Sequence, residues 1–153
     1  FSTIGSETQE KNKTWRSLGP SKIANRVRSA GYTVQVINFA TVLSYDDLKQ
    51  IADVYIGKNT IIGVSTTFMF GTHYTSRVYD ALASLIKEYK ERFNCKVILG
   101  GPNPEGLKET FHGDIIVKGF AENKIIEVID QLKNHGISKK VVKPIHAEAD
   151  RAF

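Results

Sequence analysis

Short apolar runs alternate with segments of helical periodicity along most of this chain, and this alternation is the feature that most constrains its fold. The apolar runs, rich in β-branched residues as strands are, cover 33–39, 60–65, 96–99 and 115–118. Segments with apolar residues at helical spacing cover about 20–31, 44–57, 75–93, 105–111 and 121–134. Such alternation builds βαβ units, so it predicts a three-layer, Rossmann-like or flavodoxin-like α/β fold with a mostly parallel sheet and helices on both faces.

The α/β pattern occupies the middle of the chain and divides it into three parts. Residues 1–19 are polar and irregular, and Gly19-Pro20 marks the boundary with the α/β domain, which we expect over residues 20–136. In residues 137–153 we expect a short extra strand at Val141 to Ile145 and then a linker. Because Phe1 is not a methionine and the last residues are polar, we expect a piece of a longer protein.

Cysteine content and hydropathy exclude several classes of protein. Cys95 is the single cysteine in 153 residues, so the chain has no internal disulfide and no Cys/His zinc spacing. No apolar run approaches the roughly 18 residues that a membrane span needs, and no signal-peptide pattern is found. A buried thiol in the reducing cytoplasm is the expectation that fits these observations.

The net charge of +5 is concentrated in a basic segment, residues 11–28. This segment offers one functional alternative, the binding of an anion or a nucleic acid. Only Trp15 lies among its charges, whereas single-stranded nucleic acids are bound by several interleaved aromatic platforms. We therefore expect a solvated face and no nucleic-acid partner.

Ligands of an α/β sheet bind outside the carboxyl ends of the strands, so the residues directly after each strand are the candidate site. The candidates are Ser65, Thr66, Thr67, Phe68, Gly100, Gly101, Pro102, Gly119, Phe120 and Glu122. The chain has no Walker A sequence, no G-x-G-x-x-G after a strand and no nucleophile elbow. These absences argue against catalysis by this domain alone.

Four stretches of the chain, in this order, resemble one known family. They are LGPSKIANRVRSAGYTVQVINF, IIGVSTT, VILGGPNP and VKGFAENKIIEVI. Together they are similar to the cobalamin-binding domains that precede the catalytic domain of radical S-adenosylmethionine enzymes. The resemblance spans residues 18–132 and implies a Rossmann-like domain whose strand ends carry the corrin ring, with the nucleotide tail in a slot of the sheet.

The resemblance assigns roles to the candidate residues. It implies that Ser65 and Thr67 face the nucleotide tail, and that Gly100 and Gly101 let the backbone approach it. It also implies that the loop holding Gly119, Phe120 and Glu122 lies beside the tail or ring. The chain would then be the cobalamin module of a radical enzyme, with S-adenosylmethionine and the iron–sulfur cluster in a downstream domain, because the cluster needs three cysteines.

Two departures from the family pattern matter. The D-x-H-x-x-G motif that supplies an axial histidine is absent, so we expect cobalamin to bind without a histidine below cobalt. The family's first strand is also missing, and we expect it either upstream of Phe1 or replaced by Val141 to Ile145. These departures leave open a second function, a cofactor-free structural or interaction domain that kept the fold.

Overall fold

The computed structural model describes residues 18–67, 69, 79–102, 104–134 and 141–142, and within them the sheet is parallel. Its four strands lie in the order in which they occur along the chain. They are β1 (Ile61–Ser65), β2 (Lys96–Gly101), β3 (Ile115–Lys118) and the short β4 (Val141–Val142). In this part of the chain β1 is therefore one edge of the sheet, and β4 is the other.

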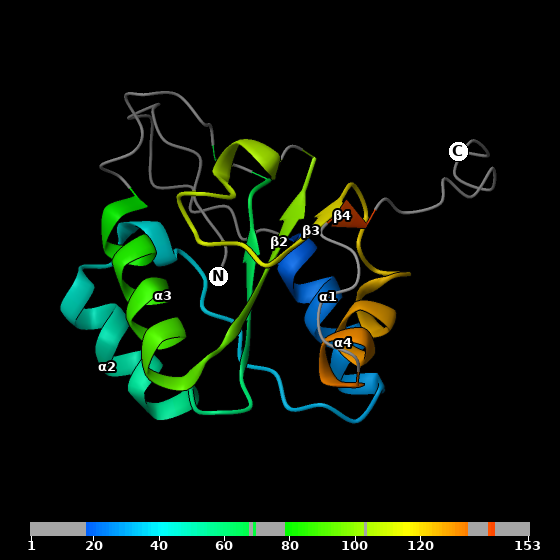
Figure 1. The fold of residues 1–153 in the computed structure, drawn as a ribbon, viewed down its shortest axis with the longest axis horizontal. Helices are drawn as coiled ribbons and strands as arrows, with labels where there is room; N and C mark the ends of the chain where they lie inside the picture. The colour runs from blue at the N-terminus through cyan, green and yellow to red at the C-terminus, as the bar shows by residue number, and fades with distance from the viewer. Residues whose placement is uncertain (1–17, 68, 70–78, 103, 135–140, 143–153) are drawn as a thin grey trace.

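Helices cover both faces of this sheet, as the sequence predicts (Figure 1). One face carries α1 (Leu18–Ser29) and α4 (Ile125–Asn134), and the other carries α2 (Tyr45–Tyr55) and α3 (Asp80–Phe93). Short 3-10 helices, η1 (Ala40–Val42) and η3 (Glu105–Leu107), lie in the connections. The domain is thus a three-layer α/β domain of the Rossmann-like or flavodoxin-like kind.

The helix boundaries follow local chemistry. Ser44 precedes α2 as its N-cap, and its hydroxyl accepts a hydrogen bond from the Asp47 amide at 3.2 Å. The chain leaves α1 through Gly31, whose φ of +88° suits glycine. The last turn of α3 closes on Asn94 in the left-handed region, where asparagine is the best-tolerated residue after glycine.

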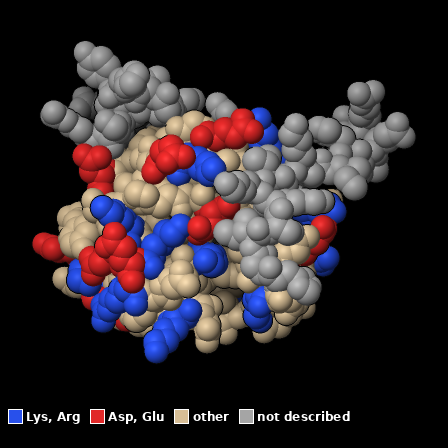
Figure 2. Space-filling view, in the orientation of Figure 1, with Lys and Arg blue, Asp and Glu red and all other residues tan. Residues whose placement is uncertain are grey.

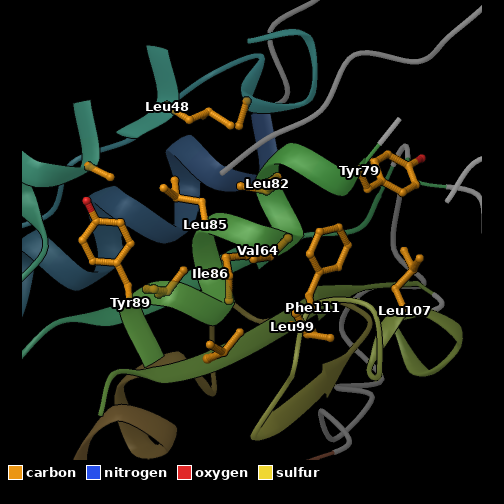
Figure 3. Packing of buried hydrophobic residues seen from close by; sticks show 14 of the residues in the cluster. Leu48, Val64, Tyr79, Leu82, Leu85, Ile86, Tyr89, Leu99, Leu107 and Phe111 are labelled. Atoms are coloured by element: carbon orange, nitrogen blue, oxygen red, sulfur yellow. The ribbon is translucent and has the colours of Figure 1, made fainter. Parts of the chain in front are cut away.

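The described apolar side chains form two clusters, one on each face of the sheet. The larger cluster lies under α2 and α3, where Leu82 and Leu85 from α3 pack with Val64 and Leu99 from the strands, and Phe111 closes one end (Figure 3). The smaller cluster lies under α1 and α4 and contains Val27, Ile98, Ile115, Val117, Ile125, Val128 and Ile129. Cys95 is buried in the larger cluster, as expected for a structural thiol.

Two strand predictions fail, and both failures concern the same edge of the sheet. The segment 33–39 is not a strand: residues 32–37 have no regular secondary structure and belong to no ladder, and Phe39 adopts a left-handed φ of 60°. A strand needs a hydrogen-bonded neighbour, and β1 is not adjacent to this segment in the described sheet. Val141–Val142 does form β4, but it pairs with β3, so it does not replace the family's first strand beside β1.

Some boundaries and one buried position also differ from expectation. The first helix begins at Leu18, the last helix begins only at Ile125, and the short segment predicted as a helix over 105–111 is a 3-10 turn at Glu105–Leu107. Tyr55, an apolar residue at helical spacing in the predicted segment 44–57, is 53% exposed at the end of α2. None of the described helices combines the length and apolarity needed to cross a membrane.

Candidate functional site

The register of the strands brings the predicted site residues together at the carboxyl ends. Ser65 of β1 is the partner of Gly100 in β2, and Gly100 is in turn the partner of Val117 in β3. The amide of Gly119 donates to the carbonyl of Gly101 at 2.9 Å, which carries the pairing one residue past β3. The loops after β1, β2 and β3 therefore leave the sheet side by side, as the parallel topology requires.

The loop after β1 is held in place by Thr66. Its amide and its hydroxyl both donate to the carbonyl of Gly100, at 2.7 and 3.0 Å, and its side chain is 3% exposed. This buried arrangement explains Gly101: a β-carbon there would lie 2.6 Å from the Thr66 hydroxyl oxygen, and the φ of +138° disfavours any side chain. Thr66 and Gly101 thus shape the loop for a reason that needs no ligand.

Ser65 and Thr67 present their hydroxyls to open space. The two hydroxyl oxygens lie 3.2 Å apart, and both residues line a cavity of about 2100 Å³ beside β1. Serine and threonine hydroxyls both donate and accept hydrogen bonds, so this pair suits a polar ligand group such as a phosphate or an amide. The sequence placed these two residues correctly in one cluster.

The cavity borders a stretch of sheet from which large side chains are missing. Gly63 and Ser65 in β1 and Gly100 in β2 share one face, that of α1 and α4, because Ile61 and Ile98 at the same parity pack in the cluster under these helices. A β-carbon on Gly63 would meet nothing within 4 Å, and one on Gly100 would meet only a carbonyl oxygen at 3.9 Å. The space above these glycines is therefore open.

Gly63 is the functional candidate that sequence reasoning missed. It is the third residue of the five-residue strand β1, IIGVS, and it is exposed there. A glycine inside a strand often marks a place where a ligand or another backbone approaches closely. That signal was present in the sequence and could have added Gly63 to the candidates.

Eight of the ten predicted site residues line the cavity. They are Ser65, Thr67, Gly100, Gly101, Pro102, Gly119, Phe120 and Glu122. Thr66 does not line it, because its side chain is turned inward onto Gly100. Phe68 lies outside the described residues, so its part in the predicted site stays a prediction.

Apolar side chains at the carboxyl end form an open rim around the cavity. Phe120, in the loop after β3, is 79% exposed, and Leu18, at the start of α1, is 72% exposed; both line the cavity. An ion pair of 2.8 Å between Lys118 and Glu105 links the end of β3 to η3. Exposed side chains as large as these at a cavity mouth are a place where a flat apolar ligand or another domain can dock.

The charge distribution does not point to a polyanion site. In the view of Figure 2, lysines and arginines are interspersed with aspartates and glutamates over the visible face. Arg26 and Arg28 of the basic segment are exposed on α1, as its helical spacing predicts. Within the described ranges no group of three or more histidine, cysteine, aspartate or glutamate side chains could hold a metal ion, and no histidine lines the cavity.

These features define the class of domain: a parallel α/β domain with a large cavity at the edge strand and a hydroxyl pair at the strand ends. No family model matches the chain, and no curated protein matches it either. Among solved structures it is similar to the crystal structure of the N-terminal domain of a hypothetical protein from Thermotoga maritima. That similarity has 21% sequence identity and a TM-score of 0.45, and covers 92% of this chain and 100% of that one.

Proposed function

We propose that this chain is a cobalamin-binding module, the domain that precedes the catalytic domain of a cytoplasmic radical S-adenosylmethionine enzyme. The observation that carries the proposal is the row of small residues, Gly63, Ser65 and Gly100, on one face of the sheet beneath an open cavity. A long nucleotide-bearing arm needs such a channel between sheet and helices. Bulky side chains at these positions would have argued against a cofactor carrier.

The residues present fit this cofactor. The nucleotide tail of cobalamin would lie over Gly63 and Gly100, with its polar groups within reach of the Ser65 and Thr67 hydroxyls. The corrin ring would rest on the carboxyl ends of the strands, against the exposed ring of Phe120. This placement follows the resemblance of IIGVSTT and VILGGPNP to the family and uses the side chains that line the cavity.

Cobalamin, when bound, supplies alkyl-transfer or radical chemistry at its cobalt, and the protein contributes binding and orientation. Because the sequence has no D-x-H-x-x-G motif, the proposal includes no histidine of this chain as a cobalt ligand. S-adenosylmethionine and the iron–sulfur cluster would belong to a downstream partner domain. A methyl transfer or a rearrangement are the two reaction classes this arrangement would serve.

The direct test uses the chain as it is. Purified protein is mixed with hydroxocobalamin and desalted, and the visible absorption of the protein fraction is recorded. Retention of the red chromophore at close to one equivalent supports the proposal. A colourless protein fraction, both from this chain and from a version carrying an apolar strand ahead of Phe1, would end it.

A steric variant locates the site. Gly100→Leu fills the open space over β2 and should weaken hydroxocobalamin binding at least about tenfold, since a buried ligand cannot share that volume with a leucine. Gly106→Leu is the matched control: a β-carbon added at Gly106 would meet nothing within 4 Å, but this glycine lies in η3 and does not line the cavity. Equal loss in both variants would place the ligand elsewhere.

One observation favours a second candidate, a cofactor-free structural or interaction domain. Of the two consecutive glycines Gly100 and Gly101, the second is explained without any ligand, because its φ and the nearby Thr66 hydroxyl both exclude a side chain. On this account the exposed Phe120 and Leu18 would contact another protein domain. The hydroxocobalamin experiment separates the two candidates, since only the first predicts a retained chromophore.

A further inference from the structure

The cavity has a second end, opposite the strand ends where the cofactor is proposed. There it is lined by Lys58, Asn59, Asn94 and Lys96, at the amino ends of β1 and β2. We call these four residues the amino-end mouth. Because β1 has five residues that each rise about 3.3 Å, this mouth lies about 13 Å or more from Ser65. The two ends of the cavity can therefore hold different chemical groups.

A tight turn between α2 and β1 builds one half of the amino-end mouth. The amide of Thr60 donates to the carbonyl of Gly57 at 3.0 Å, and the amide of Gly57 donates to the Thr60 hydroxyl at 2.9 Å. These two hydrogen bonds close the turn. Lys58 and Asn59 form its tip, where both are exposed.

The connection from α3 to β2 builds the other half, and Cys95 attaches it to the first turn. Asn94 ends α3 with a φ of 55°, and Lys96 begins β2 two residues later. Between them the buried thiol of Cys95 donates to the carbonyl of Gly57 at 3.6 Å. Burial raises the pKa of this thiol, so it keeps the proton that it donates. The two turns are thus held side by side, and each carries one lysine and one asparagine.

The charge at this end of the cavity is positive. Within the part of the chain that the structure describes, neither Lys58 nor Lys96 forms an ion pair. Lys133 also lines the cavity, with its ammonium 4.6 Å from the centre of the Tyr32 ring. Among the described lining residues the acidic side chain is that of Glu122, in the loop after β3. Lysines without acidic partners in a concave site attract an anion.

The nearby helix ends do not account for both lysines. The carbonyl end of a helix favours a cation, and Lys58 follows the end of α2, which has no basic residue in its last turn. Lys96 has no such role. It is the register partner of Ile61, which packs under α1 and α4, so its side chain lies on that face of the sheet. Both α1 and α4 carry basic residues in their own last turns.

We propose that the amino-end mouth binds the phosphate group of a small organic ligand whose apolar remainder enters the cavity. A phosphate dianion matches two ammonium groups, and the asparagine side chains supply further N–H donors. The adjoining lining is apolar and includes Ile61, Ile129 and Leu132. In the view of Figure 2 basic and acidic side chains are interspersed, so the site suits a single phosphate and not a polyanion.

The test uses the 153-residue chain without cobalamin, at about pH 8 and fixed ionic strength, where lysines are charged. Phenyl phosphate, inorganic phosphate and phenol are titrated in turn, and the amide chemical shifts are followed by NMR. Phenyl phosphate should give saturable shifts at Lys58, Asn59 and Lys96, and none at Thr67. Inorganic phosphate should bind about fivefold more weakly, because it buries no ring, and phenol should not shift the mouth amides.

Charge variants locate the site. Lys58→Gln and Lys96→Gln should each raise the Kd of phenyl phosphate about threefold, and the double variant about tenfold. Lys87→Gln is the matched control: it removes the same charge from α3, where the side chain is 61% exposed and does not line the cavity. It should leave the Kd unchanged.

Three results would overturn the proposal. Equal weakening by Lys87→Gln would mean attraction by overall charge alone, and shifts at Thr67 without shifts at the mouth would place the anion at the strand ends. Equal affinity for phenyl phosphate and inorganic phosphate would remove the apolar part of the ligand. The titrations contain no cobalamin, so failure of this proposal and failure of the cofactor proposal remain distinguishable.

Discussion

The two faces of the sheet are built differently. Under α2 and α3 the layer is closed by large side chains, and Leu82, Tyr89 and Phe111 are each no more than 1% exposed (Figure 3). Under α1 and α4 the strands present Gly63, Ser65 and Gly100 instead, and the cavity opens above them. One face thus supplies most of the packing, and the other leaves room for the cofactor that we propose.

Polar contacts reinforce this difference. Between α2 and α3, Lys49 bridges Asp53 and Glu88 at 3.2 and 3.0 Å, and Tyr89 donates to Asp53. Between the α1 end and α4, the hydroxyl of Tyr32 donates to Asp130 at 2.7 Å. The α2–α3 pair is therefore fixed by a network of charged and hydroxyl groups in addition to its apolar contacts, which suits a scaffold more than a ligand-responsive surface.

The largest expected effect tests whether most of the stability of the domain comes from the packing under α2 and α3. Phe111→Ala removes a fully buried ring that lies 5.8 Å from the Tyr79 ring, and should lower the free energy of unfolding by about 3–5 kcal/mol. Ile23→Ala shortens a partly buried side chain on the face that borders the cavity, and should lower the free energy of unfolding by only about 1 kcal/mol. Urea denaturation at neutral pH measures both.

One result for these two variants would contradict the expected difference between the two faces. If Ile23→Ala destabilises the chain as much as Phe111→Ala does, the face under α1 and α4 is packed as tightly as the face under α2 and α3. The cavity would then be closed in solution, and the difference in packing between the two faces would be lost.

A smaller effect separates the glycines that the fold needs from those that it does not. Gly101→Ala places a β-carbon 2.6 Å from the Thr66 hydroxyl at a φ of +138°, and should cost about 1–3 kcal/mol. Gly63→Ala meets open space at an ordinary φ and should change stability by less than about 1 kcal/mol, in either direction. Thermal unfolding of the two variants measures the difference. Equal losses would mean that Gly63 is also structural, and its part in the proposed channel would fall.

Most of the fold could be predicted because it depends on local patterns. The strand Ile115–Lys118 and the helix over Tyr45–Tyr55 follow from composition and spacing, and both lie within the ranges predicted from the sequence. The segment 33–39 shows the limit of such reasoning: its β-branched residues favour a strand, but a strand forms only when a neighbour supplies the other half of the ladder. The local sequence does not contain that neighbour.

The candidate site was predictable to a similar extent. Parallel topology alone brings Ser65, Thr67 and Gly100 to one end of the sheet. The inward turn of Thr66 was not predictable, because it depends on a carbonyl 34 residues away in the sequence. The extent of the cavity could not be foreseen either, since residues from α1, β1, β2 and α4 that are far apart in the sequence line it together.

The smallest effect is a pH dependence of stability, and it comes from the hydrogen bonds and ion pairs between α2 and α3. Burial, followed by the hydrogen bond to Asp53, raises the pKa of Tyr89 to about 12 from its usual value of 10. The folded state therefore holds this proton more tightly than the unfolded state, so its contribution to stability is complete below pH 10 and is lost as the pH rises toward 12. The hydrogen bonds that Lys49 donates to Glu88 and Asp53 raise its pKa as well, and this contribution has the same sign.

Tyr89→Phe isolates the share of the tyrosine. The parent chain should lose about 1 kcal/mol more of its free energy of unfolding between pH 9 and pH 11 than the variant does, because only the parent carries the buried phenol. Tyr55→Phe, at a half-exposed position on α2, is the control and should follow the parent. Urea midpoints at the two pH values measure the difference. If the Tyr89→Phe chain loses as much stability between pH 9 and pH 11 as the parent, the Tyr89 hydroxyl does not couple α3 to α2. Apolar packing alone would then distinguish the face under α2 and α3 from the face that borders the cavity.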